Sequence, residues 1–159
     1  FDFRGHGCSP YADNVWELLD TPWDLREDFD ATLNFLETVE LERSDEIVVF
    51  GASIGACVAT AVSTYENVLG GVATSAVEMW SYSMANGSFA PKGMYYFAGE
   101  LDVNEALGFY YEQDAISLSS YTKEPKKYYI KPNSDAHGVG ILEGDTELIN
   151  SAIYWIRNL

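Results

Sequence analysis

Residues 51–55 read Gly-Ala-Ser-Ile-Gly and place a serine between two glycines. An apolar run (46–50) precedes them and a segment rich in small residues (54–65) follows, so Ser53 is expected at a sharp turn from a strand into a helix. The glycines leave room for a strained backbone, and the first N–H groups of the helix, Ile54's among them, would face a developing negative charge. The pattern predicts a nucleophilic Ser53. A turn in which Ser53 only caps the helix is the alternative.

A serine hydroxyl reacts poorly until a base takes its proton, and the chain offers two histidines, His6 and His137. His137 comes just after a strand expected at 127–131 and its polar loop, which is where a base could reach Ser53. His6 follows a short apolar run at the start of the chain, so its position alone does not exclude it. We predict that His137 is the base and that His6 braces its own loop.

The base needs a carboxylate to hold its tautomer, and both Glu100 and Asp102 follow a strand expected at 94–98. Asp102 is favoured, because the turn after the strand must carry the acid across to the loop of His137. Asp135 is expected to be a solvated loop carboxylate.

Short runs of apolar, β-branched or aromatic residues alternate with helical patterns along the chain. Strands are expected at 46–50, 70–75, 94–98 and 127–131, with residues 1–3 as the end of a fifth; helices are expected at 22–40, 54–65, 104–118 and 145–156. Thr21, Pro22 and Asp24 are typical of a capped helix start. Alternating strands and helices predict a three-layer α/β fold with a mainly parallel sheet, in one domain over 1–159.

Four motifs in this order carry a family resemblance: Asp-Phe-Arg-Gly-His-Gly at 2–7, Gly-Ala-Ser-Ile-Gly-Ala at 51–56, Ala-Gly-Glu-Leu-Asp at 98–102 and Asp-Ala-His-Gly at 135–138. Together they resemble the α/β-hydrolase superfamily, in particular small bacterial esterases and dienelactone-hydrolase-like members. The resemblance implies a triad of Ser53, His137 and Asp102, with the Ile54 N–H in the oxyanion hole.

The resemblance begins at the family's fourth strand, so the fold it implies is a truncated α/β-hydrolase core. The loop that normally supplies the second oxyanion donor has no counterpart here. Either residues 1–3 pair with residues 46–50 or the sheet has an open edge. An open edge favours a homodimer or a lost N-terminal partner.

Residues 76–92 are too few for the lid domain that many family members insert at this point. Met79 and Trp80 in this segment are candidates for contact with a substrate, and core packing is the alternative for them. A pocket without a lid favours small soluble esters over emulsified lipids.

A formal charge of −16 excludes nucleic acid as an expected partner, because phosphates would be repelled. No apolar run is long enough to span a membrane, and no signal peptide is recognisable, so the cytoplasm is the default compartment. Two cysteines, Cys8 and Cys57, lack metal-ligand spacing and are expected to be free thiols. No metal or cofactor is expected.

The predicted function is hydrolysis of small carboxylic esters through an acyl-enzyme on Ser53. A non-catalytic remnant or binding module is the alternative outside enzymes. Thioesterase, lactone hydrolase and peptidase activity are alternatives within enzymes, because all share acyl-enzyme chemistry and differ in the shape of the pocket.

Overall fold

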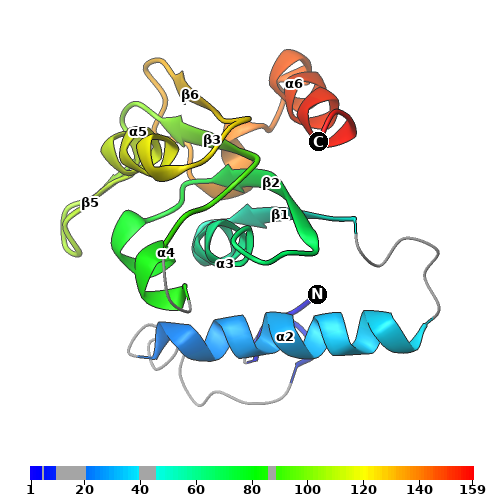
Figure 1. Ribbon diagram of the computed structural model, residues 1–159. Coiled ribbons are helices and arrows are strands. Elements are labelled where there is room, and N and C mark those ends of the chain that lie inside the picture. The colour runs from blue at the N-terminus through cyan, green and yellow to red at the C-terminus, as the bar shows by residue number, and fades with distance from the viewer. Residues whose placement is uncertain (5, 10–20, 40–45, 86–88) are drawn as a thin grey trace.

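A computed structural model describes residues 1–4, 6–9, 21–39, 46–85 and 89–159. Four parallel strands form its main sheet in the order β1-β2-β3-β6 (Figure 1). They are β1 (Ile47–Ala52), β2 (Val68–Thr74), β3 (Met94–Gly99) and β6 (Lys127–Lys131). The predicted mainly parallel sheet is therefore confirmed, although β2 begins two residues earlier than expected.

Helices cover both faces of the sheet (Figure 1). On one face α3 (Ile54–Val62) packs against β1 and β2, and α5 (Tyr111–Tyr121) packs against β3 and β6. Farther out, α4 (Glu78–Met84) packs on α3, and α2 (Pro22–Thr38) packs on both α3 and α4. The other face is covered by α6 (Thr146–Arg157) and the short 3-10 helix η1 (Gly138–Ile141). This arrangement confirms an α/β fold of a sheet between helical layers.

Residues 1–3 form no strand, so the predicted fifth strand is wrong. Phe3 instead packs against the hydrophobic core, and the guanidinium of Arg4 pairs with Asp28 of α2 at 2.7 Å. These contacts tie the N-terminal segment to helices rather than to the sheet. No described residue pairs with the outer edge of β1, as the open-edge alternative anticipated.

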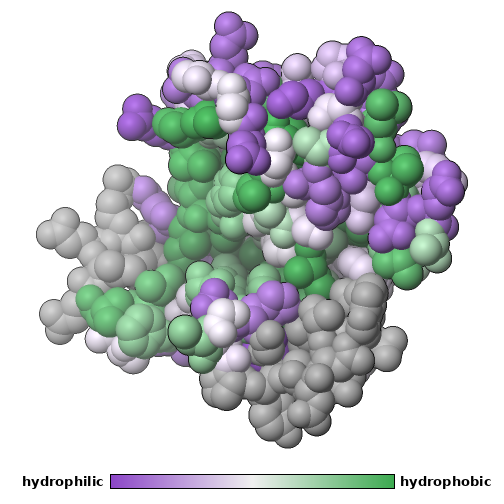
Figure 2. All heavy atoms as spheres, turned by 180° about the vertical axis from the view of Figure 1, so that it is seen from behind, coloured by the Kyte–Doolittle hydropathy of each residue, from purple (hydrophilic) through white to green (hydrophobic). Residues whose placement is uncertain are grey.

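A cleft of about 700 Å³ lies along this edge, between β1, α3, α2 and the N-terminal segment. It is lined by Phe1, Phe3, His6, Phe29, Thr32, Leu36, residues 47–55, Val58, Ala59 and Val62. Viewed from behind, the molecule shows hydrophobic side chains gathered in a hollow (Figure 2). The cleft is therefore an apolar surface beside the outer edge of β1, with which no described residue pairs.

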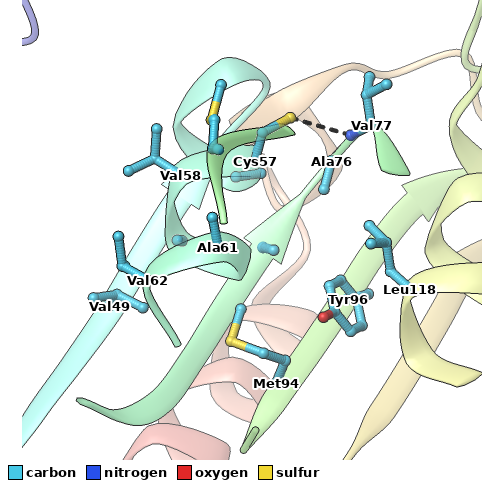
Figure 3. Close-up of a cluster of buried hydrophobic side chains, with 14 of the residues drawn as sticks. Val49, Cys57, Val58, Ala61, Val62, Ala76, Val77, Met94, Tyr96 and Leu118 are labelled. Carbon is cyan, nitrogen blue, oxygen red and sulfur yellow. Dashed lines mark hydrogen bonds between the residues drawn. The ribbon is translucent and has the colours of Figure 1, made fainter. Parts of the chain in front are cut away.

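Strand β3 is buried at every position, as its continuous apolar run predicts for a strand between two helical layers. Tyr96 faces the α3 side, where it packs with Met94, Leu118 and α3 (Figure 3). Tyr95 and Phe97 face the α6 side. The Tyr96 hydroxyl pairs with the Thr122 hydroxyl at 2.8 Å, so its burial leaves no polar group unsatisfied.

The helix predicted over 104–118 is wrong in its first half. The strands β4 (Val103–Asn104) and β5 (Phe109–Tyr110) form a small antiparallel hairpin there, and α5 begins only at Tyr111. Local turn chemistry explains the difference, because the Asn104 side chain accepts from the Leu107 N–H at 3.2 Å and Gly108 takes φ +71°.

Helix α2 begins at Pro22 as predicted, but the half of the expected capping box that the Thr21 side chain would supply is wrong. The Thr21 side chain makes no capping hydrogen bond, and the Asp24 N–H donates to the Thr21 carbonyl at 3.0 Å. The Asp24 carboxylate forms an ion pair with the Arg4 guanidinium at 3.9 Å. Residue 40, the predicted end of this helix, lies outside the described residues.

None of the helices in the described part of the chain is long and apolar enough to cross a membrane.

Candidate active site

Ser53 lies between the last residue of β1 and the first residue of α3 with a left-handed backbone, φ 54° and ψ −121°. A residue other than glycine adopts this conformation only where its surroundings enforce it. Here the Ser53 N–H donates to the Thr74 carbonyl of β2 at 2.8 Å. The Ser53 carbonyl accepts from the N–H of Ala56 at 2.9 Å at the start of α3. The strand-to-helix turn is therefore held at both ends.

The two glycines of the motif have different roles. A Cβ at position 51 would overlap the carbonyl group of Gly55, so only glycine fits there. A Cβ at position 55 would lie 3.6 Å from the ring of Phe3, which is ordinary contact. Gly51 is therefore required for the close approach of the backbone, as expected of both glycines. Gly55 is not, because the space around it would admit a methyl group.

His137 lies in the loop after β6, and its Nε2 is 2.8 Å from the Ser53 Oγ. Its ring packs edge-on against the largely buried Tyr111, with ring centroids 4.7 Å apart. The His137 side chain is nevertheless 41% exposed, so a molecule arriving from solvent could reach it. The structure therefore brings the expected base to the expected nucleophile.

Asp102 lies behind the histidine and is only 5% exposed. Its two carboxylate oxygens are 3.1 and 3.0 Å from the His137 Nδ1. An ionised carboxylate only accepts hydrogen bonds, so the Nδ1 carries the proton and donates it. The Nε2 of a neutral ring is then free to accept from the Ser53 hydroxyl, which is the geometry that general-base catalysis needs.

The two other candidate acids lie elsewhere. Glu100 accepts from the Asn133 N–H at 2.6 Å and so braces the loop that leads to His137, without bonding to the ring. Asp135 is exposed, as expected for a solvated carboxylate. Between Asp102 and Glu100, the geometry therefore selects Asp102.

The turn that carries Asp102 packs closely on the loop that carries His137. A Cβ at position 99 would lie 3.0 Å from the Ala136 carbonyl oxygen, tighter than side chains normally approach. Gly99 therefore allows the acid turn to approach the histidine loop.

Sequence reasoning missed two side chains in this group. Ser75, directly after β2, donates a hydrogen bond to the Asp102 Oδ2 at 2.7 Å. Tyr111 supplies the ring against His137 described above, and burial raises the pKa of its hydroxyl to about 12. Only the place of Ser75 at the carboxyl end of a central strand could have indicated it, since catalytic groups gather at that edge of a parallel sheet.

The N–H of Ile54 is at the first position of α3, where no intrahelical partner exists. No hydrogen bond joins it to any other described residue. It is therefore available to an oxygen atom bound beside Ser53.

The apolar cleft beside β1 is lined by Ile54, Ser53 and His6, among other residues. The His6 Nδ1 pairs with the Arg4 carbonyl at 3.3 Å, in keeping with the expected bracing role.

Met79 and Trp80 are not among the described residues that line this cleft. Trp80 packs edge-on against Phe109, with centroids 4.7 Å apart. Met79 is 60% exposed and lines a second cavity of about 270 Å³ between the start of α4, the β4–β5 hairpin and the start of α5, where Asp114 also lies. Their contact with a substrate stays a prediction.

Cys57 lies one helical turn after Ser53 and is fully buried. Its Sγ accepts from the Val77 N–H at 3.2 Å, the contact marked by a dashed line in Figure 3. Burial raises the pKa of the thiol to about 12, so the sulfur packs beneath the turn as a neutral group. Cys8 is exposed, and both cysteines are free.

The described residues include no group of three or more His, Cys, Asp or Glu side chains that could hold a metal ion. Comparison of the chain with protein-family models, curated proteins and solved structures found no match.

Proposed function

We propose that this chain is a serine hydrolase with an α/β-hydrolase-type core, which cleaves small carboxylic esters through an acyl-enzyme. The observation that carries the proposal is the hydrogen-bonded series from the Ser53 Oγ to the His137 Nε2, at 2.8 Å, and from the His137 Nδ1 to Asp102, at 3.0 Å. The strained backbone of Ser53 at the strand-to-helix turn adds support, because that turn is where this fold holds its nucleophile.

The proposed reaction has two halves. The Ser53 Oγ attacks the ester carbonyl carbon while its proton moves to the His137 Nε2, and the carbonyl oxygen becomes an oxyanion beside the Ile54 N–H. Collapse of the tetrahedral adduct breaks the bond to the alcohol oxygen, which takes the proton from His137. Water then attacks the acyl-Ser53 carbonyl and gives a proton to His137. The bond from the acyl carbon to the Ser53 Oγ breaks, the Oγ takes that proton back from His137, and the carboxylic acid leaves. Asp102 stays ionised and stabilises the imidazolium in both halves.

The apolar cleft beside Ser53 suits the acyl portion of such an ester, since apolar surface gains free energy when it leaves water. Ile54 is the single oxyanion donor identified among the described residues. We therefore expect slow turnover, because removal of one such donor costs a serine hydrolase about 10²–10³ in rate.

Hydrolysis of p-nitrophenyl acetate and butyrate tests the proposal directly. The parent chain is expected to release p-nitrophenol above the buffer rate, and Ser53→Ala is expected to abolish the difference. Ser83→Ala is the matched control, because the Ser83 hydroxyl is exposed on α4 and bonds only within that helix, to Met79. Equal rates for the parent and Ser53→Ala would show that Ser53 is not the nucleophile.

The second candidate function is a binding module in which the three residues do no chemistry. It is favoured by the outer edge of β1, with which no residue in the described part of the chain pairs, so that its backbone groups are open to another chain. Thioesters, lactones and peptides would react through the same acyl-enzyme, so relative rates on these substrates decide among the enzyme classes.

A further inference from the structure

Ser75 is the residue directly after β2, and the solvent does not reach it. Its backbone is left-handed, with φ 54°, as is that of Ser53. The Ser75 N–H donates to the Phe97 carbonyl of β3 at 2.8 Å, which holds the residue at the end of the sheet. A left-handed backbone costs free energy for any residue but glycine, so it persists only where the surrounding contacts hold it. The contacts of the Ser75 side chain are therefore of interest.

The Ser75 hydroxyl is bonded on both sides. It accepts from the Gly138 N–H at 2.9 Å, and it lies 2.7 Å from the Asp102 Oδ2. The amide can only donate and the ionised carboxylate can only accept, so the one proton of the hydroxyl points to Asp102. At 2.7 Å this is a charge-assisted hydrogen bond, about twice as strong as one between neutral groups.

Each partner of the hydroxyl belongs to a different part of the site. The Asp102 Oδ2 that it bonds also accepts from the His137 Nδ1, at 3.0 Å. Gly138 is the residue next to His137 and takes φ +58°. Ser75 thus connects the end of β2 to the acid and to the histidine loop at once, and its hydroxyl makes no hydrogen bond to Ser53.

We propose that Ser75 is a positioning residue that holds Asp102 and His137 in the orientation needed for proton transfer from Ser53. The inference rests on the proposed function and adds a fourth residue to it. The competing explanation is purely structural. In it, the buried Ser75 hydroxyl only accepts the hydrogen bond of the Gly138 N–H and has no effect on the orientation of the His137 ring.

Two substitutions separate the effect of the Ser75 hydroxyl from the free-energy cost of its left-handed backbone. Ser75→Ala removes the hydroxyl and keeps the backbone cost, whereas Ser75→Gly removes both and so protects the test against loss of folding. Ser63→Ala is the matched control. Ser63 is equally buried and also bonds on both sides, to the Thr60 carbonyl at 2.7 Å and from the Lys92 N–H at 3.3 Å, but it lies away from the site.

The test measures kcat and KM for p-nitrophenyl acetate together with the low-field proton NMR signal of the His137 Nδ1–H. Both Ser75 variants are expected to lose about 10- to 100-fold in kcat with KM changed less than about twofold, since the interaction acts on proton transfer. Their Nδ1 proton is expected to exchange faster with water, and Ser63→Ala is expected to match the parent in all three quantities.

Parental kcat in both Ser75 variants, or an equal loss in Ser63→Ala, would overturn the inference. If the parent chain hydrolyses no ester, the proposed function fails, and the NMR signal alone decides. An Nδ1 proton that exchanges at the parental rate in both Ser75 variants would then overturn the role of Ser75.

Discussion

The Cα of Gly51 packs against the carbonyl group of Gly55, so the end of β1 and the first turn of α3 touch without a side chain between them. Between these two contacting glycines, Ser53 adopts its left-handed backbone, with φ 54°. The strand-to-helix turn therefore depends on the absence of a Cβ at position 51.

Substitution of the two glycines is expected to give opposite results. Gly51→Ala should destabilise the fold by about 2 kcal/mol or more, because the methyl group must displace backbone atoms. Gly55→Ala should leave stability unchanged or raise it by up to about 1 kcal/mol, because alanine favours a helix and meets only Phe3 at ordinary distance. Urea unfolding of the two variants beside the parent checks this, and equal losses would contradict it.

Asp114 is expected to make stability depend on pH. Its carboxylate accepts from the Glu78 N–H at the start of α4 at 3.3 Å, and burial raises its pKa from 3.8 to about 6. The folded chain thus binds this proton more tightly than the unfolded chain does. The charged form opposes folding above pH 6, and this penalty disappears as the pH falls from 6 to below 4.

Asp114→Asn keeps an acceptor for Glu78 and removes the charge. It is expected to raise the free energy of unfolding at pH 7.5 by about 1–3 kcal/mol and to leave it nearly unchanged at pH 4. Asp135→Asn is the control, because it removes the same charge from an exposed loop position. If Asp114→Asn raises the free energy of unfolding as much at pH 4 as at pH 7.5, Asp114 is not the source of the pH dependence. An equal gain in Asp135→Asn would contradict it too.

The two thiols are expected to differ in reactivity. Thiolate is the reactive form of cysteine, and with a pKa of about 12 the buried Cys57 is about one part in 10⁴ thiolate at pH 8. A maleimide should therefore label one thiol of the native chain at Cys8 and two thiols in urea. Cys8→Ser should leave the native chain unlabelled. Rapid labelling of both thiols without denaturant would show that α3 does not pack as described.

The outer edge of β1, which stays unpaired among the described residues, predicts a homodimer in solution. A charge of −16 repels a second copy, so the dimer is expected to strengthen as salt screens that charge. Light scattering at high protein concentration in 0.05 M and 0.5 M salt measures this. A strictly monomeric species in both would remove the prediction.

Much of the fold was predictable because its patterns are local. The continuous apolar run of β3 indicated a strand buried on both faces, and the small residues of α3 indicated close packing on the sheet. The hairpin before α5 was missed because its apolar spacing also fits a helix, and only Asn104 and Gly108 determine the turn. Residues 1–3 looked like a strand because β propensity does not say whether a partner strand is present.

The candidate site was predictable where residues stand in motifs. Ser53, Asp102 and His137 each follow a strand, and parallel strands bring such positions to one edge of the sheet. Ser75 follows a strand too, but a single serine has no spacing that distinguishes it from a turn residue. Its partners became visible only when the acid turn and the histidine loop were placed in space.

Labelling with a fluorophosphonate probe tests the central claim most directly, because the probe reacts with a serine hydroxyl only when an assembled base activates it. The account predicts one adduct on Ser53, located by mass spectrometry of peptides, and none in Ser53→Ala or in the urea-unfolded chain. A folded chain that forms no adduct on Ser53 would contradict it and favour the binding module.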